Sequence, residues 1–196
     1  MKLVKNINKD ELNKISKIVG EAFINNELFH EFGEIECRRP FVMKYMNEYV
    51  KCVYELKALY SNEDGTAFIG LSYSDKKKMI PQIKMIFRLL RIIPYKVNKR
   101  FLNHIKQISD GNKKYTVNTY LEVLFVCVSK EHQKEGKSKE LVNFAKEMAR
   151  KRRVPLLFDT DMEEYAKIYE HYGCKLYNKK TASNGVVRYN LVWNEF

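Results

Sequence analysis

The chain has 196 residues, 45% of them hydrophobic, which is enough to bury a core without metal ions or disulfide bonds. Its formal net charge of +12 favours anionic partners such as phosphates, nucleic acids or an anionic membrane surface, but identifies none of them. No segment has the ~20 apolar residues of a membrane span or the N-terminal apolar stretch of a signal peptide, so we expect a cytoplasmic protein with reduced cysteines.

The N-terminal third of the sequence predicts a strand, two helices and a hairpin. The strand is expected over Lys2 to Ile7, and Asp10 can cap a helix that follows it. Pro40 is expected to begin the second helix, because apolar residues recur at helical spacing after it. The stretch from Ala58 to Ser74 contains two β-prone runs around an Asp-Gly pair, which is typical of a hairpin.

The segment from Lys76 to Lys106 predicts a basic amphipathic helix interrupted at Pro94. Its apolar stripe contains Ile83, Phe87, Leu90 and Ile93. Such a stripe can lie on a membrane or hold an anionic partner, but more often it faces the protein's own core. We therefore expect these side chains to be buried.

After a turn predicted over residues 109–114, the pattern is strand, helix, strand, helix and two strands. The run from Thr119 to Ser129 is almost continuously β-prone, as in a strand buried on both faces. A helix through Arg153, a strand at 154–161 and a helix ending at Gly173 follow, and then a closing hairpin. This order predicts a parallel pair in the middle of a mixed sheet, within one domain covering residues 1–196.

The stretch "KEHQKEGKSKELVNF" places a glycine where the long strand gives way to a helix. The first amides of a helix have no internal partner, so they can bind a phosphate. Gly136 and Ser138 would allow close approach, and Lys134, Lys137 and Lys139 add charge. The stretch lacks the patterns of a P-loop and of a dinucleotide-binding fold. By itself it fits a charged first helical turn equally well.

In its wider context this stretch resembles the GNAT superfamily of acetyl-CoA-dependent N-acetyltransferases. The family signature [RQ]-x-x-G-x-[GA] is filled by Gln133 to Ser138, with serine at the last position. A second family motif is matched by Ile168, Tyr169 and Glu170, followed by Gly173 and Cys174. The resemblance covers about residues 119–193.

The resemblance implies an α+β fold, with a mixed, mostly antiparallel sheet whose central strands splay apart and which is flanked by helices. It implies transfer of an acetyl group from acetyl-CoA, as cosubstrate, to a primary amine of a small molecule or peptide by direct attack, with no metal. The implied cofactor-binding residues come from the strand and from the loop after it: Val126, Cys127, Val128, Gln133, Lys134, Glu135, Gly136, Lys137, Ser138 and Lys139.

Two residues are the candidates for proton transfer. Glu122 is an acid in an otherwise apolar strand, at a position where some family members carry a catalytic base, but it could equally be an outward-facing glutamate. Tyr169 matches the family tyrosine that protonates the leaving thiolate, and the alternative is a packed helix tyrosine. His132 and His171 are expected to be exposed and not catalytic.

The sequence departs from the family at Ser138, Tyr165 and Cys174, and these changes could weaken the CoA site. A CoA-binding or interaction module of the same fold without turnover is therefore the main alternative. A specific nucleic-acid-binding protein ranks last, because the basic residues are spread over the chain. We expect an amine acceptor as partner and no membrane span, and leave a homodimer open.

The acceptor pocket is expected between the N-terminal helices and the 76–106 segment. Phe29, Phe32 and Tyr73 are its candidate aromatic residues, with burial in the core as the alternative for each.

Overall fold

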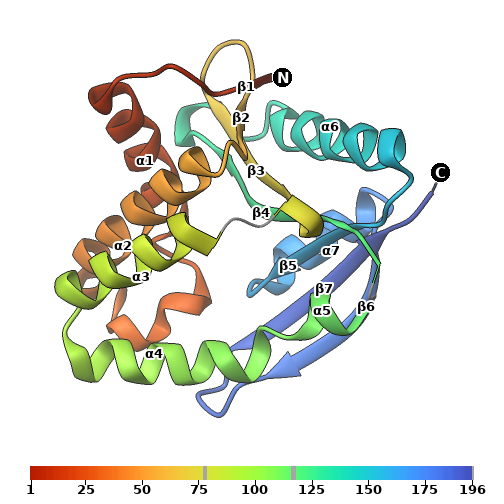
Figure 1. The fold of residues 1–196 in the computed structure, drawn as a ribbon. Coiled ribbons are helices and arrows are strands. Elements are labelled where there is room, and N and C mark those ends of the chain that lie inside the picture. Colours follow the sequence, from red (N-terminus) through yellow and green to blue (C-terminus); the bar gives the residue numbers. More distant parts are fainter. Residues whose placement is uncertain (77–78, 116–117, 196) are drawn as a thin grey trace.

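The computed structural model describes residues 1–76, 79–115 and 118–195 (Figure 1). The helices are α1 (Lys9–Phe23), α2 (Ile35–Glu55), α3 (Met79–Ile92), α4 (Tyr95–Ile108), α5 (Gly111–Tyr115), α6 (Lys137–Arg152) and α7 (Glu163–His171), with 3-10 turns η1 (Glu27–Phe32), η2 (Ser74–Lys76) and η3 (Lys130–His132). The strands are β1 (Lys2–Leu3), β2 (Leu59–Ser61), β3 (Ala67–Tyr73), β4 (Leu121–Val128), β5 (Leu156–Thr160), β6 (Lys175–Thr181) and β7 (Val187–Trp193).

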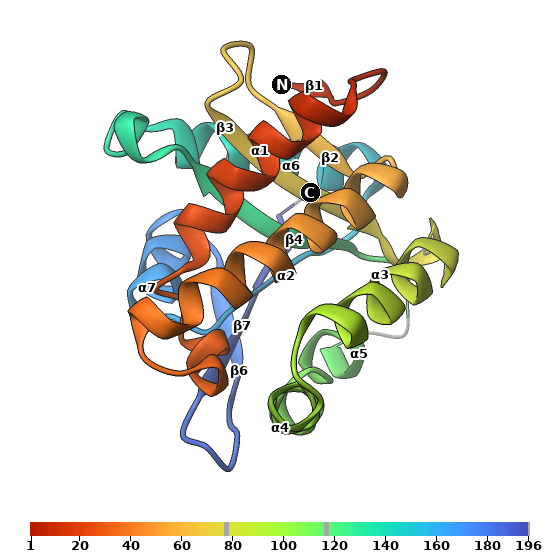
Figure 2. The ribbon, with the colours of Figure 1, turned by 90° about the vertical axis from the view of Figure 1, so that its left-hand side faces the viewer.

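The strands of the described residues form one sheet in the order β1-β2-β3-β4-β5-β7-β6. Neighbouring strands are antiparallel except β4 and β5, which are parallel. Helices α1 and α2 lie on one side of the sheet and α6 lies on the other (Figures 1 and 2). The predicted mixed, mostly antiparallel sheet flanked by helices is thus confirmed.

A β-bulge at Leu124 makes β4 contribute to both hydrophobic cores. Gly70 pairs with Phe125 and Leu71 pairs with Val123, so Leu124 is the extra residue of the bulge. Before the bulge, Val123 packs in the core beneath α6. After it, Phe125 packs in the core beneath α1 and α2, although two residues this far apart in a regular strand would lie on the same side of the sheet. The bulge therefore reverses the side on which alternate residues of the strand lie.

Three predictions at the N-terminus need correction. The first strand is only two residues long. Helix α1 is capped by Asn8 and not by Asp10, because the Asn8 side chain accepts from the Glu11 amide (2.9 Å) while Glu11 accepts from the Asn8 amide (2.8 Å). Helix α2 begins before Pro40, which lies inside it. The proline lacks only the hydrogen bond to the Glu36 carbonyl, near the start of a long helix.

The segment after the hairpin agrees with the prediction in part. Pro94 separates α3 from α4, as expected. The stretch predicted as a turn contains the short helix α5. Two residues expected in the first helix, Lys77 and Lys78, lie outside the described residues. In the part of the chain that is described, no helix is both long and apolar enough to cross a bilayer.

The predicted burial of the apolar stripe is wrong for most of its residues. Ile93 is buried, but Ile83, Phe87 and Leu90 are exposed. The helix turns a different set of apolar residues toward α2, namely Met85, Leu89 and Ile92.

Candidate functional site

The two parallel strands separate after a short paired stretch. Leu121 lies opposite Leu156, and Glu122 lies opposite Leu157; among the described residues β4 and β5 form no further pair. A cavity of about 620 Å³ lies beyond this point, lined by residues of β4, the loop after it, β5, α7, β7 and the helices α1, η1, α2 and α4. The expected splaying of the central strands is therefore present.

The open edge of β4 presents unpaired backbone groups to this cavity. The Ser129 amide donates to the Thr66 carbonyl on the β3 side (2.8 Å). Successive residues of a strand direct their amides and carbonyls to opposite sides, so Cys127 also faces β3, whereas Val126 and Val128 face the gap toward β5. Both valines line the cavity. A ligand in the gap could therefore bond to them as a neighbouring strand would.

The loop after β4 holds its backbone in a conformation that suits an anion. Lys134 and Gly136 have φ values of +67° and +80°, and Gly136 is the N-cap of α6. A glycine adopts this conformation without steric cost. Within the described residues, none of the amides from Gln133 to Lys139 donates to another protein group. Such amides at a helix N-terminus form an anion-binding site.

The charged side chains of this loop are tied to one another. Glu135 lies 3.2 Å from both the Lys137 Nζ and the His132 Nδ1. The hydrogen bond from Lys137 is the main cause that lowers the pKa of Glu135, and the hydrogen bond from His132 adds to the effect. Lys137 also donates to Thr66 (3.2 Å), so its ammonium group points toward the β2–β3 turn.

Ser138, the departure from the family signature, has its hydroxyl 3.0 Å from the Tyr172 hydroxyl. Both residues line the cavity. The serine side chain is therefore anchored to the C-terminal end of α7.

Tyr169 lies on α7 and lines the cavity. Its ring packs against Phe158 of β5, with 4.8 Å between the ring centroids. Burial is the main cause that raises its pKa above the usual value of 10, and Cys174 adds to the shift. Among the described residues the hydroxyl has no hydrogen-bond partner. The side chain is therefore a protonated phenol at the wall of the cavity.

Glu122 is held by a buried polar network outside the cavity lining. Its carboxylate accepts from the Asn112 side chain of α5 (3.2 Å). Asn112 in turn accepts from the Tyr177 hydroxyl (2.7 Å) and from Asn190 (3.2 Å). Burial raises the pKa of Tyr49, which lines the cavity, and the neighbouring Tyr45 and then Asp159 and Glu122 add to the shift.

A group of charged residues lies at the other end of the cavity. Arg188 of β7 donates twice to Asp161, at 2.6 and 2.9 Å, and also pairs with Asp159. Arg188 and Asp161 are buried, whereas the Asp159 side chain is 28% exposed. Burial raises the pKa of Asp161 even though Arg188 opposes the shift. Two carboxylates share one guanidinium, which leaves one negative charge at this end.

Aromatic residues of the N-terminal helices surround that charged group. Tyr45 and Tyr49 of α2 and Phe29 of η1 line the cavity. The Tyr49 hydroxyl donates to the carbonyl of Leu124 at the bulge (3.3 Å). Burial raises the pKa of Tyr45 to about 12, partly against the effect of Arg188. This end of the cavity is therefore aromatic with a charged floor.

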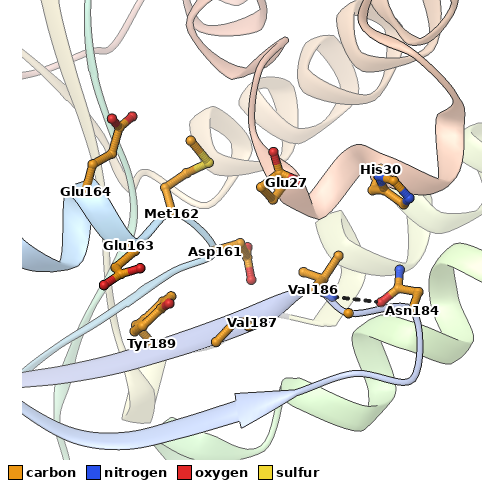
Figure 3. Close-up of a pocket in the computed structure, with 11 residues that line it drawn as sticks. Glu27, His30, Asp161, Met162, Glu163, Glu164, Asn184, Val186, Val187 and Tyr189 are labelled. Atoms are coloured by element: carbon orange, nitrogen blue, oxygen red, sulfur yellow. Dashed lines mark hydrogen bonds between the residues drawn. The ribbon is translucent and has the colours of Figure 1, made fainter.

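A second cavity of about 480 Å³ shares Asp161 with the first. Figure 3 shows Asp161 between η1, which carries Glu27 and His30, and the β6–β7 hairpin. Glu163 and Glu164 at the start of α7 also line it, and no lysine or arginine of the described residues does. Within the described residues, no group of three or more His, Cys, Asp or Glu side chains is placed to hold a metal ion.

Most of the cofactor-binding residues expected from the sequence line the main cavity. Among the predicted site residues, the loop residues Glu135 and Lys139 and the catalytic candidate Glu122 do not. At the place predicted for an acceptor, the cavity is lined by residues of the N-terminal helices and, from the 76–106 segment, by Ile105; of the candidate aromatic residues, Phe29 lines the cavity and Phe32 and Tyr73 do not. The predicted residues that line it are Val126, Cys127, Val128, Gln133, Lys134, Gly136, Lys137, Ser138 and Tyr169.

Sequence reasoning missed the charged group formed by Asp159, Asp161 and Arg188. Its signals were present: Asp159 and Asp161 interrupt the end of an apolar strand, and Arg188 interrupts the apolar final strand. Charged residues at such positions are seldom buried unless they are paired.

Comparisons with known proteins connect this geometry to one fold. No family model and no curated protein matches the sequence. Among solved structures, the chain is similar to PH1933 from Pyrococcus horikoshii OT3, with 13% identity over 100% of this chain and 97% of the other and a TM-score of 0.60. It is also similar to a histone acetyltransferase HPA2 and related acetyltransferase from Corynebacterium glutamicum, with 11% identity over 96% and 92% and a TM-score of 0.59.

A third similar structure is the NatC complex bound to Gag peptide and CoA, with 12% identity over 100% of this chain and 97% of the other and a TM-score of 0.52. At these identities the likeness concerns the fold. The chain has the fold of the GNAT acetyltransferases, and its structural neighbours include acetyltransferases.

Proposed function

We propose that the chain is an N-acetyltransferase that moves an acetyl group from acetyl-CoA to a primary amine of a small molecule or peptide. The observation that carries this proposal is the opening between β4 and β5, where two strand amides and a run of helix-start amides without protein partners meet one cavity. A long ligand with amide groups at one end and phosphates at the other matches that order. Coenzyme A is such a ligand, and one similar structure contains it.

The backbone would do most of the cofactor binding. Val126 and Val128 would bond the pantetheine amides, and the amides from Gln133 to Lys139 would hold the pyrophosphate. Cys127 would contribute no bond of its own, because its backbone faces β3. Acetyl-CoA supplies an activated acetyl thioester when bound.

Tyr169 would protonate the departing sulfur. Its side chain lines the cavity, and the raised pKa keeps the hydroxyl protonated at neutral pH. General acid catalysis of this kind typically contributes ~10² to 10⁴-fold to the rate.

Two carboxylates compete for the role of the base that takes the proton from the amine. Glu122 is the residue expected from the sequence, and it would act through water because it does not line the cavity. Asp159 lines the cavity directly but is paired with Arg188. Replacing the true base with its amide should move the rise of activity with pH toward the amine's own pKa of about 10. We would compare Glu122→Gln with Asp159→Asn; the base is the residue whose variant shows that shift.

The acceptor would bind between α2 and the charged group. The negative charge left on Asp159 and Asp161 favours a protonated amine, and Tyr45, Tyr49 and Phe29 favour an acceptor with an apolar part. We also propose a cytoplasmic location, where the four thiols, none of them in a disulfide, would stay reduced.

Calorimetric titration with CoA, followed by an amine screen that records free thiol, tests this proposal. We expect CoA to bind and ATP, which has phosphates but no pantetheine, to bind more weakly. Absence of CoA binding would overturn the assignment. Binding of CoA without thiol release across the screen would instead support the alternative of a CoA-binding module without turnover.

A further inference from the structure

The positive charge of the chain is concentrated where acidic residues are missing. Residues 76–109 contain ten of the 36 Lys and Arg residues and none of the 24 Asp and Glu residues. The remainder of the chain has 26 basic and 24 acidic residues and is therefore close to neutral. This segment, which includes α3 and α4, thus carries +10 of the net charge of +12.

The outer side of α3 is apolar and exposed. Met79, Ile80 and Phe87 are exposed by 62 to 70%, and Ile83, Ile86 and Leu90 by 44 to 47%. With 3.6 residues per turn, these six side chains fall within an arc of roughly 120° on one face of the helix. We call this face the α3 outer face. Exposed apolar side chains that gather in one patch mark an interaction site more often than scattered ones do.

The opposite side of α3 is firmly packed. Leu89 is buried against α2, and Arg88 pairs with Glu48 of α2 (3.3 Å). Figure 2 shows α3 at the margin of the molecule, with α2 on one side and no described element over the other. The α3 outer face is therefore a fixed part of the folded surface.

Basic side chains flank the α3 outer face. Lys84 and Arg91 lie beside it on α3, and Lys96 and Lys99 follow on α4; all are exposed, and none forms an ion pair with a described residue. Tyr95, at the corner between the helices, is 72% exposed. Large apolar residues bordered by unpaired cations are the pattern of a helix that lies in the interface of an anionic bilayer.

We propose that the α3 outer face binds the surface of an anionic lipid bilayer. Its six apolar side chains enter the region between headgroups and acyl chains, and the flanking lysines and arginines contact the lipid phosphates. The association is peripheral, because α3 is a 14-residue helix whose other side stays packed on α2. This inference does not depend on the proposed acetyl transfer.

Charge argues against two other occupants of this face. A second copy of the chain, bound face to face, would bring two segments of +10 together, which costs energy at every salt concentration. Single-stranded nucleic acid stacks its bases on exposed aromatic residues, but five of the six apolar residues here are aliphatic. An anionic bilayer satisfies both the charge and the aliphatic surface.

Flotation of the full chain with phosphatidylcholine vesicles, with and without phosphatidylglycerol, tests the proposal. We expect the protein to float with the anionic vesicles at low salt and to stay unbound with the neutral ones. Phe87→Ser with Leu90→Ser should lower the lipid partition coefficient about tenfold or more, because two exposed side chains no longer insert. Lys84→Glu with Arg91→Glu should abolish the binding.

Matched variants outside the face separate this effect from general ones. Ile35→Ser with Leu176→Ser removes two exposed apolar residues elsewhere, and Lys151→Glu with Lys175→Glu makes the same charge change elsewhere. Both pairs should bind the anionic vesicles as the unchanged chain does. Binding that follows net charge alone, or that the Phe87 and Leu90 changes leave intact, would overturn the proposal.

A fluorescent reporter tests insertion directly. The single native tryptophan, Trp193, is buried, so Phe87→Trp adds an exposed indole against a constant background. Its emission should shift to shorter wavelength with anionic vesicles but not with glycerol phosphate, which carries the charge without the acyl chains. An unshifted emission while the protein is bound, or tighter binding to RNA or to an acidic protein than to vesicles, would contradict insertion at this face.

Discussion

The two ends of the main cavity are built from different parts of the chain. At the end proposed for the cofactor, called the cofactor end, the polar groups are backbone amides of β4 and of the loop before α6, and the side chains there bond to one another or to the β2–β3 turn. At the acceptor end the polar groups are side chains: Asp159, Asp161 and Arg188, beneath Tyr45 and Tyr49. The polar groups of the first end are therefore set by the backbone conformation, and those of the second end are set by which residues are present.

This difference predicts where substitutions matter. Side chains at the cofactor end should be replaceable as long as the backbone keeps its shape. At the acceptor end a single replacement should leave a buried charge without its partner. The predictions below contrast the two ends, beginning with the largest expected effect.

Replacing Arg188 with methionine should lower the free energy of unfolding by about 3 to 5 kcal/mol at neutral pH, because two carboxylates lose their shared partner. Lys137→Met, which removes a cation at the cofactor end, should cost less than about 1 kcal/mol. Urea denaturation measures both. The Arg188 deficit should shrink as the pH falls through the pKa of Asp161, which burial raises, because that buried carboxylate then becomes neutral. If both variants lost the same free energy of unfolding, the proposed difference between the two ends of the cavity would be wrong.

Tyr169→Phe should lower kcat about 100-fold or more while the affinity for CoA stays unchanged, because the variant loses only a proton donor. Tyr165→Phe, one turn earlier on the same helix and also in the cavity lining, is the matched control and should keep its kcat. Because burial raises the pKa of Tyr169 above its usual value of 10, the native enzyme should show no alkaline loss of this acid below about pH 10. An unaltered kcat in Tyr169→Phe would exclude it as the acid.

Gly136→Ala should weaken CoA binding about tenfold, since a non-glycine residue at φ +80° costs about 1 to 2 kcal/mol and the loop would relax away from the anion-binding shape. The KM for the amine should not change. Gly185→Ala introduces the same strain at φ +88° in the β6–β7 turn and should leave CoA affinity intact. Calorimetry of both variants makes the comparison, and a similar loss in both would point to general destabilisation.

Ser138→Ala should change CoA affinity by less than about threefold, because the hydroxyl lies against that of Tyr172 and one such part-buried hydrogen bond contributes about 1 kcal/mol. Tyr172→Phe removes the same hydrogen bond from the other side and should behave alike. A large gain in affinity for Ser138→Ala alone would instead mean that the serine obstructs the pyrophosphate.

The cofactor end was largely predictable because its signals are local in sequence. A β-prone strand, Gln133 and Gly136 at fixed spacing and a helix directly afterwards specify a loop whose amides point outward. The acceptor end was not predictable, because Arg188 meets Asp161 only after β7 pairs with β5. Nothing in the spacing of these residues along the chain indicates that pairing.

Helix α3 shows a second limit. Its periodicity correctly placed Ile83, Phe87 and Leu90 on one face. However, Met85, Leu89 and Ile92 form a second face that is also apolar and also follows helical spacing. Periodicity identifies residues that share a face and does not say which face meets the protein. Here the contacts with α2 decide, and they select the second set.

The bulge at Leu124 also determines how β4 tolerates changes in length. Because it shifts the phase of the strand by one residue, Val123 and Phe125 serve opposite cores although they are two positions apart. Deleting Leu124 would make Val123 and Phe125 neighbours in a regular alternation, so Phe125 and Cys127 would stay beneath α1 and α2 while Val126 and Val128 would still lie on the α6 side. The amides that now face the gap would keep that direction, so β4 should accept the loss of this one residue, and the contact given up would be the hydrogen bond from the Tyr49 hydroxyl to the Leu124 carbonyl.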